Sequence, residues 1–100
     1  MLEKEIEKAV CDYAKSKNVW VRKFLSPANT GCPDRIFITQ TGKVFFIEFK
    51  SKGKKLTEKQ EIIRKEIVSR KIRYFVCDNI IMGKFIIDKQ IEHETTYLPN

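Results

Sequence analysis

The chain has 100 residues, a hydrophobic fraction of 42% and a formal net charge of +7 at pH 7. This length gives one domain with its own core and excludes a second, so residues 1–100 are predicted to be a single domain. No segment reaches the roughly 18 consecutive apolar residues of a membrane span, and the charged N-terminus is unlike a secretion signal. We therefore expect a cytoplasmic protein with no membrane partner.

The positive charge is concentrated in one segment. Between Lys50 and Arg73 there are ten Lys or Arg and three acids, an excess of seven, so the rest of the chain is neutral. A localised basic field favours a polyanionic partner, most often nucleic acid. The alternatives are a solvated helix face that only aids solubility, or a surface for an acidic protein.

Hydrophobic spacing predicts the elements of the first half. Residues 2–15 repeat apolar side chains at three- and four-residue steps, which is typical of an amphipathic helix. Residues 18–25 predict a first strand, with Trp20 in the core, and residues 26–33 a loop. Residues 34–40 and 43–50 predict two strands that form an antiparallel hairpin with its turn at Gly42.

The second half opens with a basic loop over residues 51–55. Thr57 followed by Gln60 fits the capping box that begins a helix, here over residues 58–70, and residues 72–78 predict another strand. Beyond Asn79 the pattern allows a hairpin over residues 80–87 around Gly83 and a short helix over residues 88–94. The order α-β-β-β-α-β predicts an α/β domain with a mixed β-sheet flanked by helices.

The second strand of the hairpin ends in charge. Alternation places Phe46, Glu48 and Lys50 on one face, and both faces are apolar before Glu48. Because antiparallel neighbours reverse direction, Asp34 and Glu48 should meet at one end of the sheet. Two close carboxylates repel unless a cation lies between them, and Mg²⁺ or Mn²⁺ prefers such oxygen ligands. With Lys50 to stabilise charge on a phosphate, the pattern predicts a phosphodiester hydrolysis site.

These residues resemble a known superfamily. Pro33 and Asp34, followed by E-x-K from Glu48 to Lys50, are similar to the motif of PD-(D/E)xK nucleases. The fuller set "GCPD", "FFIEFK", a short basic link and "LTEKQ" resembles the VRR-NUC (virus-type replication-repair nuclease) branch, over most of the chain from the first helix to "YFVCD". The resemblance implies a restriction-endonuclease-like fold and an endonuclease that hydrolyses DNA with Mg²⁺ or Mn²⁺.

The resemblance also implies individual roles. Asp34, Glu48 and the backbone carbonyl of Phe49 would be metal ligands, and Lys50 the catalytic lysine. The family's helix-borne Glu and Gln map to Glu3, as a further catalytic residue and metal ligand, and to Gln60, as a catalytic residue; Glu5 and Glu7 are alternatives to Glu3. The expected DNA contacts are Arg35, Lys52, Lys54, Lys55 and Lys59. Arg35 departs from the apolar residue that usually follows the PD pair.

Relatives of this size imply a homodimer that acts on branched or junction DNA, such as a Holliday junction, in viral (phage) or mobile-element replication and repair. For a viral protein, the expected location is the host cell cytoplasm. The alternative function is a non-catalytic nucleic-acid-binding module that uses residues 50–73. Each of these site residues also has a structural interpretation: Asp34 ends a loop, Gln60 completes a capping box, Glu3 complements a helix dipole, and Glu48 with Lys50 is a surface ion pair.

Overall fold

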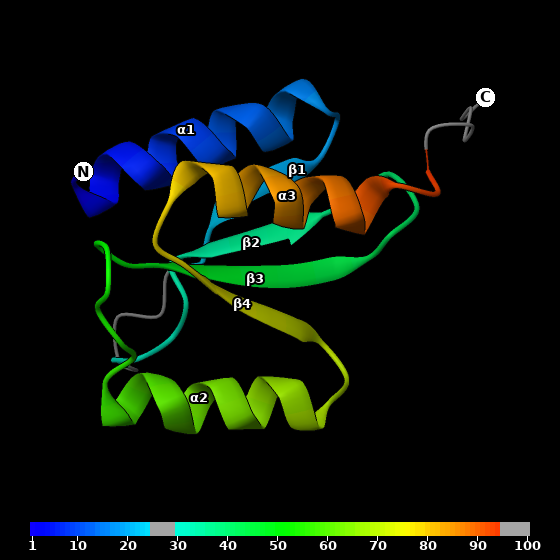
Figure 1. The fold of residues 1–100 in the computed structure, drawn as a ribbon. Coiled ribbons are helices and arrows are strands. Elements are labelled where there is room, and N and C mark those ends of the chain that lie inside the picture. The colour runs from blue at the N-terminus through cyan, green and yellow to red at the C-terminus, as the bar shows by residue number, and fades with distance from the viewer. Residues whose placement is uncertain (25–29, 95–100) are drawn as a thin grey trace.

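The computed structural model describes residues 1–24 and 30–94 (Figure 1). Its described part contains four strands and three helices: β1 (Trp20–Lys23), β2 (Arg35–Ile38), β3 (Val44–Phe49), β4 (Arg73–Cys77), α1 (Glu3–Ser16), α2 (Glu58–Ser69) and α3 (Ile80–Ile91). This mixed sheet flanked by helices confirms the predicted fold class. Residue 25 of the predicted first strand and residues 26–29 of the predicted loop lie outside the described residues.

The sheet has the order β1-β2-β3-β4. β1, β2 and β3 are antiparallel, and β4 runs parallel to β3 after the crossover through α2. The predicted hairpin is therefore confirmed as β2 and β3, and Gly42 in its turn has a φ of 93°. β3 is an inner strand whose residues after Val44 are all buried, as its two apolar faces predict.

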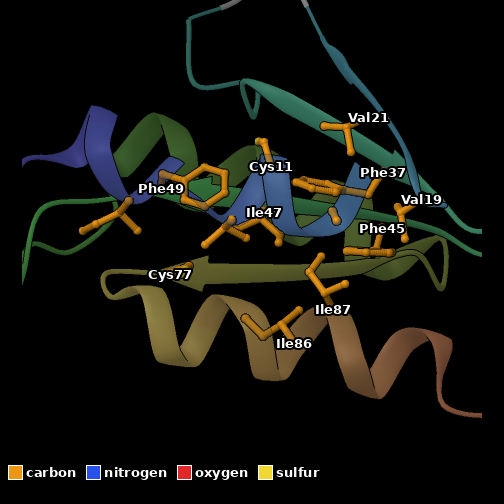
Figure 2. Packing of buried hydrophobic residues seen from close by; sticks show 13 residues of the cluster. Cys11, Val19, Val21, Phe37, Phe45, Ile47, Phe49, Cys77, Ile86 and Ile87 are labelled. Carbon is orange, nitrogen blue, oxygen red and sulfur yellow. The ribbon is translucent and has the colours of Figure 1, made fainter. Parts of the chain in front are cut away.

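Helices cover both faces of the sheet, but unequally. α1 and α3 lie on one face and α2 lies on the other, where it packs against β4 (Figure 1). The hydrophobic core fills the space between the sheet and the α1–α3 layer, with Phe37, Phe45 and Ile47 of the sheet facing Ile86 and Ile87 of α3 (Figure 2). The α1–α3 layer thus supplies the rigid support on which the strand ends are held.

Residues 80–91 form one helix, so the predicted hairpin around Gly83 and Lys84 is wrong, and the predicted short helix over residues 88–94 is the end of a longer one. Asn79 caps this helix by accepting a hydrogen bond from the Met82 backbone N–H at 2.7 Å. Gly83 is not a turn residue: a Cβ there would lie 2.3 Å from Val10 of α1. Glycine is needed because α1 and α3 approach closely at this point.

Trp20 does not fill the core, contrary to the sequence prediction. Trp20 is 47% exposed, and the Arg22 guanidinium lies over its ring, 4.5 Å from the ring centroid. The neighbouring residue Val21 occupies the core instead, because β1 alternates its faces. Within residues 1–24 and 30–94, no helix is long and apolar enough to cross a membrane.

Candidate active site

Glu48 is a buried carboxylate at the end of the inner strand. Only 3% of it is exposed, and its Oε1 atom has no hydrogen-bond partner among the described residues. The pKa of Glu48 is raised to about 7, mainly by burial and next by the nearby Asp34 carboxylate, while the charge of Lys50 opposes the shift. An acceptor oxygen without a donor, in a group that is costly to ionise, is the feature expected of a ligand site rather than of a surface ion pair.

Asp34 lies opposite Glu48 in the hairpin. The register pairs Arg35 with Ile47, which sets the preceding residue, Asp34, across from Glu48. The Asp34 carbonyl accepts a hydrogen bond from the Phe24 backbone N–H at 2.8 Å, so the β1–β2 ladder extends to this residue. Asp34 itself is exposed. The predicted meeting of the two carboxylates at one end of the sheet is therefore what the structure has.

Three glutamates of α1 were candidates for the same site, and two have other partners. The Glu5 carboxylate accepts a hydrogen bond from the Leu2 backbone N–H at 3.0 Å, and Glu7 forms an ion pair with Arg35 at 2.8 Å. Glu3 and Glu7 both raise the pKa of Glu48, so the start of α1 lies near the strand end. Glu3 has no such hydrogen bond or ion pair with the described residues.

Arg35, predicted as a DNA contact, has a partner within the protein itself. Its Nε donates to Glu7, and both side chains are about one-fifth exposed, at 21% and 20%. The ion pair joins β2 to α1 beside the carboxylates. Arg35 thus positions the start of α1 as well as adding positive charge to this end of the sheet.

Gln60 lies in the first turn of α2 and completes the predicted capping box. The Thr57 backbone N–H donates to Gln60 Oε1 at 3.0 Å, and the Gln60 backbone N–H donates to Thr57 Oγ1 at 3.2 Å. Gly31 packs against the same turn, because a Cβ at Gly31 would lie 2.9 Å from the Lys59 carbonyl and 3.1 Å from the Gln60 nitrogen. Gly31, three residues before Asp34, thus packs against the turn that carries Gln60.

Lys50 follows β3 and extends its ladder by donating its backbone N–H to the Cys77 carbonyl at 2.9 Å. The basic loop that comes next is tied down at Gly53, whose backbone N–H donates to Asp78 Oδ2 at 3.0 Å. This hydrogen bond lowers the pKa of Asp78, and the charge of Lys52 adds to the effect. The loop lysines therefore stay beside the end of β3.

Two hollows with cationic walls border the carboxylates. One, of about 580 Å³, lies between the start of α2 and the end of β4 and is lined in part by Lys54, Lys55 and Val76, the last of which pairs with Glu48. The other, of about 310 Å³, is lined by Lys4, Glu7, Lys23, Asp34 and Arg35. Lysines on both sides of the carboxylates suit a polyanionic chain that crosses this end of the sheet.

The residues at this end fit a divalent cation. Glu48 offers a buried oxygen without a donor, and Asp34 offers a second carboxylate of the type that Mg²⁺ and Mn²⁺ prefer. Among residues 1–24 and 30–94, no three His, Cys, Asp or Glu side chains are gathered closely enough to hold a metal ion. The predicted ligands Asp34, Glu48 and Glu3 are therefore not gathered around one point among the described residues, so a cation on Asp34 and Glu48 would need the Phe49 carbonyl and water to complete its ligands.

Sequence reasoning missed two residues of this region. Tyr74 lies on β4 beside the end of β3. Asp78, which follows β4, accepts a hydrogen bond from Gly53 of the basic loop. Alternation places Tyr74 on the same face as Val76, but only the β3–β4 register shows that this is the Glu48 face. For Asp78, the sequence signal was an acid directly after a strand and within reach of the basic loop.

The model of the VRR-NUC domain family matches residues 3–79 of this chain, which is more than three-quarters of it. The chain belongs to the VRR-NUC family. A solved structure described as "VRR_NUC domain" is similar over 92% of this chain and 96% of its own, with a TM-score of 0.77 and 25% sequence identity. The VRR-NUC resemblance and its fold are thus confirmed, and the carboxylates, Lys50 and Gln60 all lie within the matched residues.

A phage protein is also similar. "Putative nuclease p44" of Acyrthosiphon pisum secondary endosymbiont phage 1 is 36% identical over 58 residues, which are 58% of this chain and 62% of p44. The match thus spans less than two-thirds of the phage protein's length. Family and relative together support a nuclease domain, and a nuclease domain has a nucleic acid as its partner.

Proposed function

We propose that this VRR-NUC chain is an endonuclease that hydrolyses DNA phosphodiester bonds with Mg²⁺ or Mn²⁺. The observation that carries the proposal is the state of Glu48. The residue is 3% exposed, and its Oε1 has no hydrogen-bond donor among the described residues. Asp34 lies opposite it, and the charge of Lys50 is near enough to lower its pKa. A structural role alone does not account for this arrangement, because an unpartnered buried carboxylate destabilises the fold.

Each residue has a defined part. Asp34, Glu48 and the Phe49 carbonyl would hold the cation, with Glu3 beside them on α1. When bound, the cation would lower the pKa of a water molecule and neutralise charge on the scissile phosphate. Lys50 would stabilise the negative charge that grows on that phosphate, and the Gln60 side-chain amide would orient water or the phosphate from the start of α2.

The DNA backbone would lie across the two cationic hollows. Lys52, Lys54, Lys55 and Lys59 would contact phosphates on the α2 side, and Arg35 on the α1 side. These are contacts to phosphate only, so they give affinity without sequence specificity. We extend the proposal to branched or junction DNA in phage or mobile-element replication and repair, because a dimer of such sites would reach two strands.

The proposed homodimer is supported by an apolar face that α2 leaves uncovered. Trp20 and Phe24 are 47% and 40% exposed on the sheet face away from α1 and α3. Analytical ultracentrifugation of Trp20→Ser tests this: we expect monomers, whereas Ile81→Ser, on the exposed surface of α3, should remain dimeric. A wild-type protein that sediments as a monomer at high concentration would exclude the dimer.

The activity is tested with linear, flapped and four-way DNA, each incubated with Mg²⁺, Mn²⁺ or a chelator. We expect cleavage with metal only, and its loss in Glu48→Gln with DNA affinity retained. Glu66→Gln, which removes an exposed carboxylate from α2, is the matched control and should cleave normally. If wild-type protein binds these DNAs but cuts none with either metal, the non-catalytic binding module replaces the nuclease.

A further inference from the structure

Two buried side-chain atoms among the described residues have no hydrogen-bond partner, and both lie on the same face of the sheet. They are Glu48 Oε1 and the Tyr74 hydroxyl. The β3–β4 register pairs Phe46 with Tyr74 and Glu48 with Val76, so Tyr74 is the diagonal neighbour of Glu48 on the adjacent strand. In such a diagonal pair the two Cα atoms are roughly 8 Å apart, and two long side chains can span most of that distance.

Electrostatics support this proximity. Burial raises the pKa of the Tyr74 hydroxyl, and the charge of Glu48 is the next cause. The charges of Arg64 and Glu61 on α2 also shift the pKa of Tyr74, so its hydroxyl lies near the helix that covers this face. The hydroxyl is therefore enclosed between the sheet and α2, on the side of the active-site carboxylates.

A shared partner would satisfy both atoms at once. Buried polar groups in folded proteins nearly always have a partner, and where no protein atom is near enough the partner is an ordered water. Tyrosine can donate to such a water, and the water can donate to a carboxylate. Two unpartnered atoms on neighbouring strands, one a donor and the other an acceptor, are complementary ends of such a bridge.

We propose that one buried water joins the Tyr74 hydroxyl to Glu48 Oε1 and that Tyr74 is a positioning residue of the active site. The hydroxyl donates to the water and the water donates to one lone pair of Oε1, which fixes the rotation of the carboxylate and leaves the second lone pair of Oε1 and the other oxygen for the cation. The bridge itself is independent of metal. Only its consequence for cation binding rests on the proposed nuclease function.

The test is Tyr74→Phe, which removes the hydroxyl and keeps the ring. In metal-free protein, carbon-13 NMR should show the Glu48 carboxyl pKa raised, because the ionised form loses a donor. Manganese titration followed by electron paramagnetic resonance should show about tenfold weaker binding, as for other outer residues that orient a ligand. Tyr13→Phe is the matched control: its hydroxyl donates to Asp88 at 2.6 Å outside the site, and neither quantity should change.

An unchanged Glu48 pKa in Tyr74→Phe, or a higher melting temperature than wild type, would overturn the proposal, since both mean that the hydroxyl has no partner to lose. A crystal structure of metal-free wild type gives a second measurement without any variant: a water within hydrogen-bonding distance of both atoms is expected, and a dry contact contradicts the bridge. If wild-type protein bound no manganese, the nuclease proposal would fail, while the NMR and crystallographic results would still decide the role of Tyr74.

Discussion

Gly31 lies against the first turn of α2, where a Cβ would come within 2.9 Å of the Lys59 carbonyl. Gly31 also has a φ of +98°, a conformation that residues with a Cβ avoid. The loop that leads to Asp34 and the helix that carries Gln60 are thus held together through a residue without a side chain. This contact explains physically why a glycine precedes the Pro33-Asp34 pair.

Gly31→Ala is predicted to lower the free energy of unfolding more than Gly42→Ala does. Both glycines have nearly the same φ, but a Cβ at Gly42 would meet nothing within 4 Å. Gly42→Ala should therefore cost about 1–2 kcal/mol for the backbone conformation alone. Gly31→Ala should cost a further 1–3 kcal/mol, roughly, for the close approach to α2. Urea unfolding measures both, and equal losses would show that the contact with α2 is unimportant.

Glu48 should make the metal-free protein less stable as the pH rises. Its pKa in the folded protein is about 7, above the ordinary value of 4.5, so the folded state keeps its proton while the unfolded state loses it. The contribution of Glu48 to the free energy of unfolding should be greatest below pH 4.5. It should fall by about 3 kcal/mol as the pH rises to 7. Urea unfolding at a series of pH values measures this.

The matched variants for that experiment are Glu48→Gln and Glu66→Gln. Glu48→Gln cannot ionise, so its stability should not fall between pH 4.5 and 7, and it should be more stable than wild type at pH 8. Glu66→Gln should follow the wild-type curve. A wild-type curve that is flat over this range would mean that Glu48 has an ordinary pKa and is not desolvated.

Glu94 is predicted to anchor the β2–β3 turn. Its buried carboxylate accepts hydrogen bonds from Thr39 Oγ1 at 2.8 Å and from the Thr41 backbone N–H at 3.1 Å. Glu94→Ala leaves these donors without a partner and should cost about 2 kcal/mol. Glu92→Ala, which breaks exposed contacts with Lys89 and His93, should cost roughly 1 kcal/mol or less. Comparable losses in chemical unfolding would contradict the anchor.

The same carboxylate should contribute to acid lability. Desolvation works to raise the pKa of Glu94, but the hydrogen bonds from Thr41 and Thr39 outweigh it and lower the pKa overall. A lowered pKa stabilises the fold above the ordinary value of 4.5, and this contribution is lost as the pH falls through the folded pKa. Glu94→Ala should therefore lose less stability than wild type below pH 4.5.

The basic loop is predicted to bind phosphates of the DNA backbone. Replacing Lys52, Lys54 and Lys55 with Gln should weaken DNA binding and reduce the slope of log K against log salt by about 0.9 for each phosphate that is no longer neutralised. The control replaces Lys8, Lys15 and Lys84, on the α1–α3 layer across the sheet, with Gln. It removes the same charge, and its slope should stay near that of wild type. Equal changes in slope would mean that net charge alone, rather than the loop, attracts DNA.

Local features of this protein could be predicted from neighbouring residues. Alternation in residues 43–50 predicted an inner strand that ends in Glu48, and Gly42 predicted the hairpin turn, because strand period and turn chemistry depend on neighbouring residues only. The Thr57–Gln60 capping box was predicted for the same reason, and the structure has it. The four elements "GCPD", "FFIEFK", the basic link and "LTEKQ", in this order, were sufficient to indicate a VRR-NUC domain.

The tertiary structure alone decided what depends on contacts between distant segments. Gly83 looks like a turn residue in sequence, yet it lies inside α3. The residue there is a glycine because Val10 of α1 leaves no space for a side chain. Glu5 and Glu7 became less suitable than Glu3 once their partners Leu2 and Arg35 were in place. Tyr74 joined the face of Glu48 only through the β3–β4 register, since strand pairing over 28 residues of sequence separation is not encoded in any local pattern.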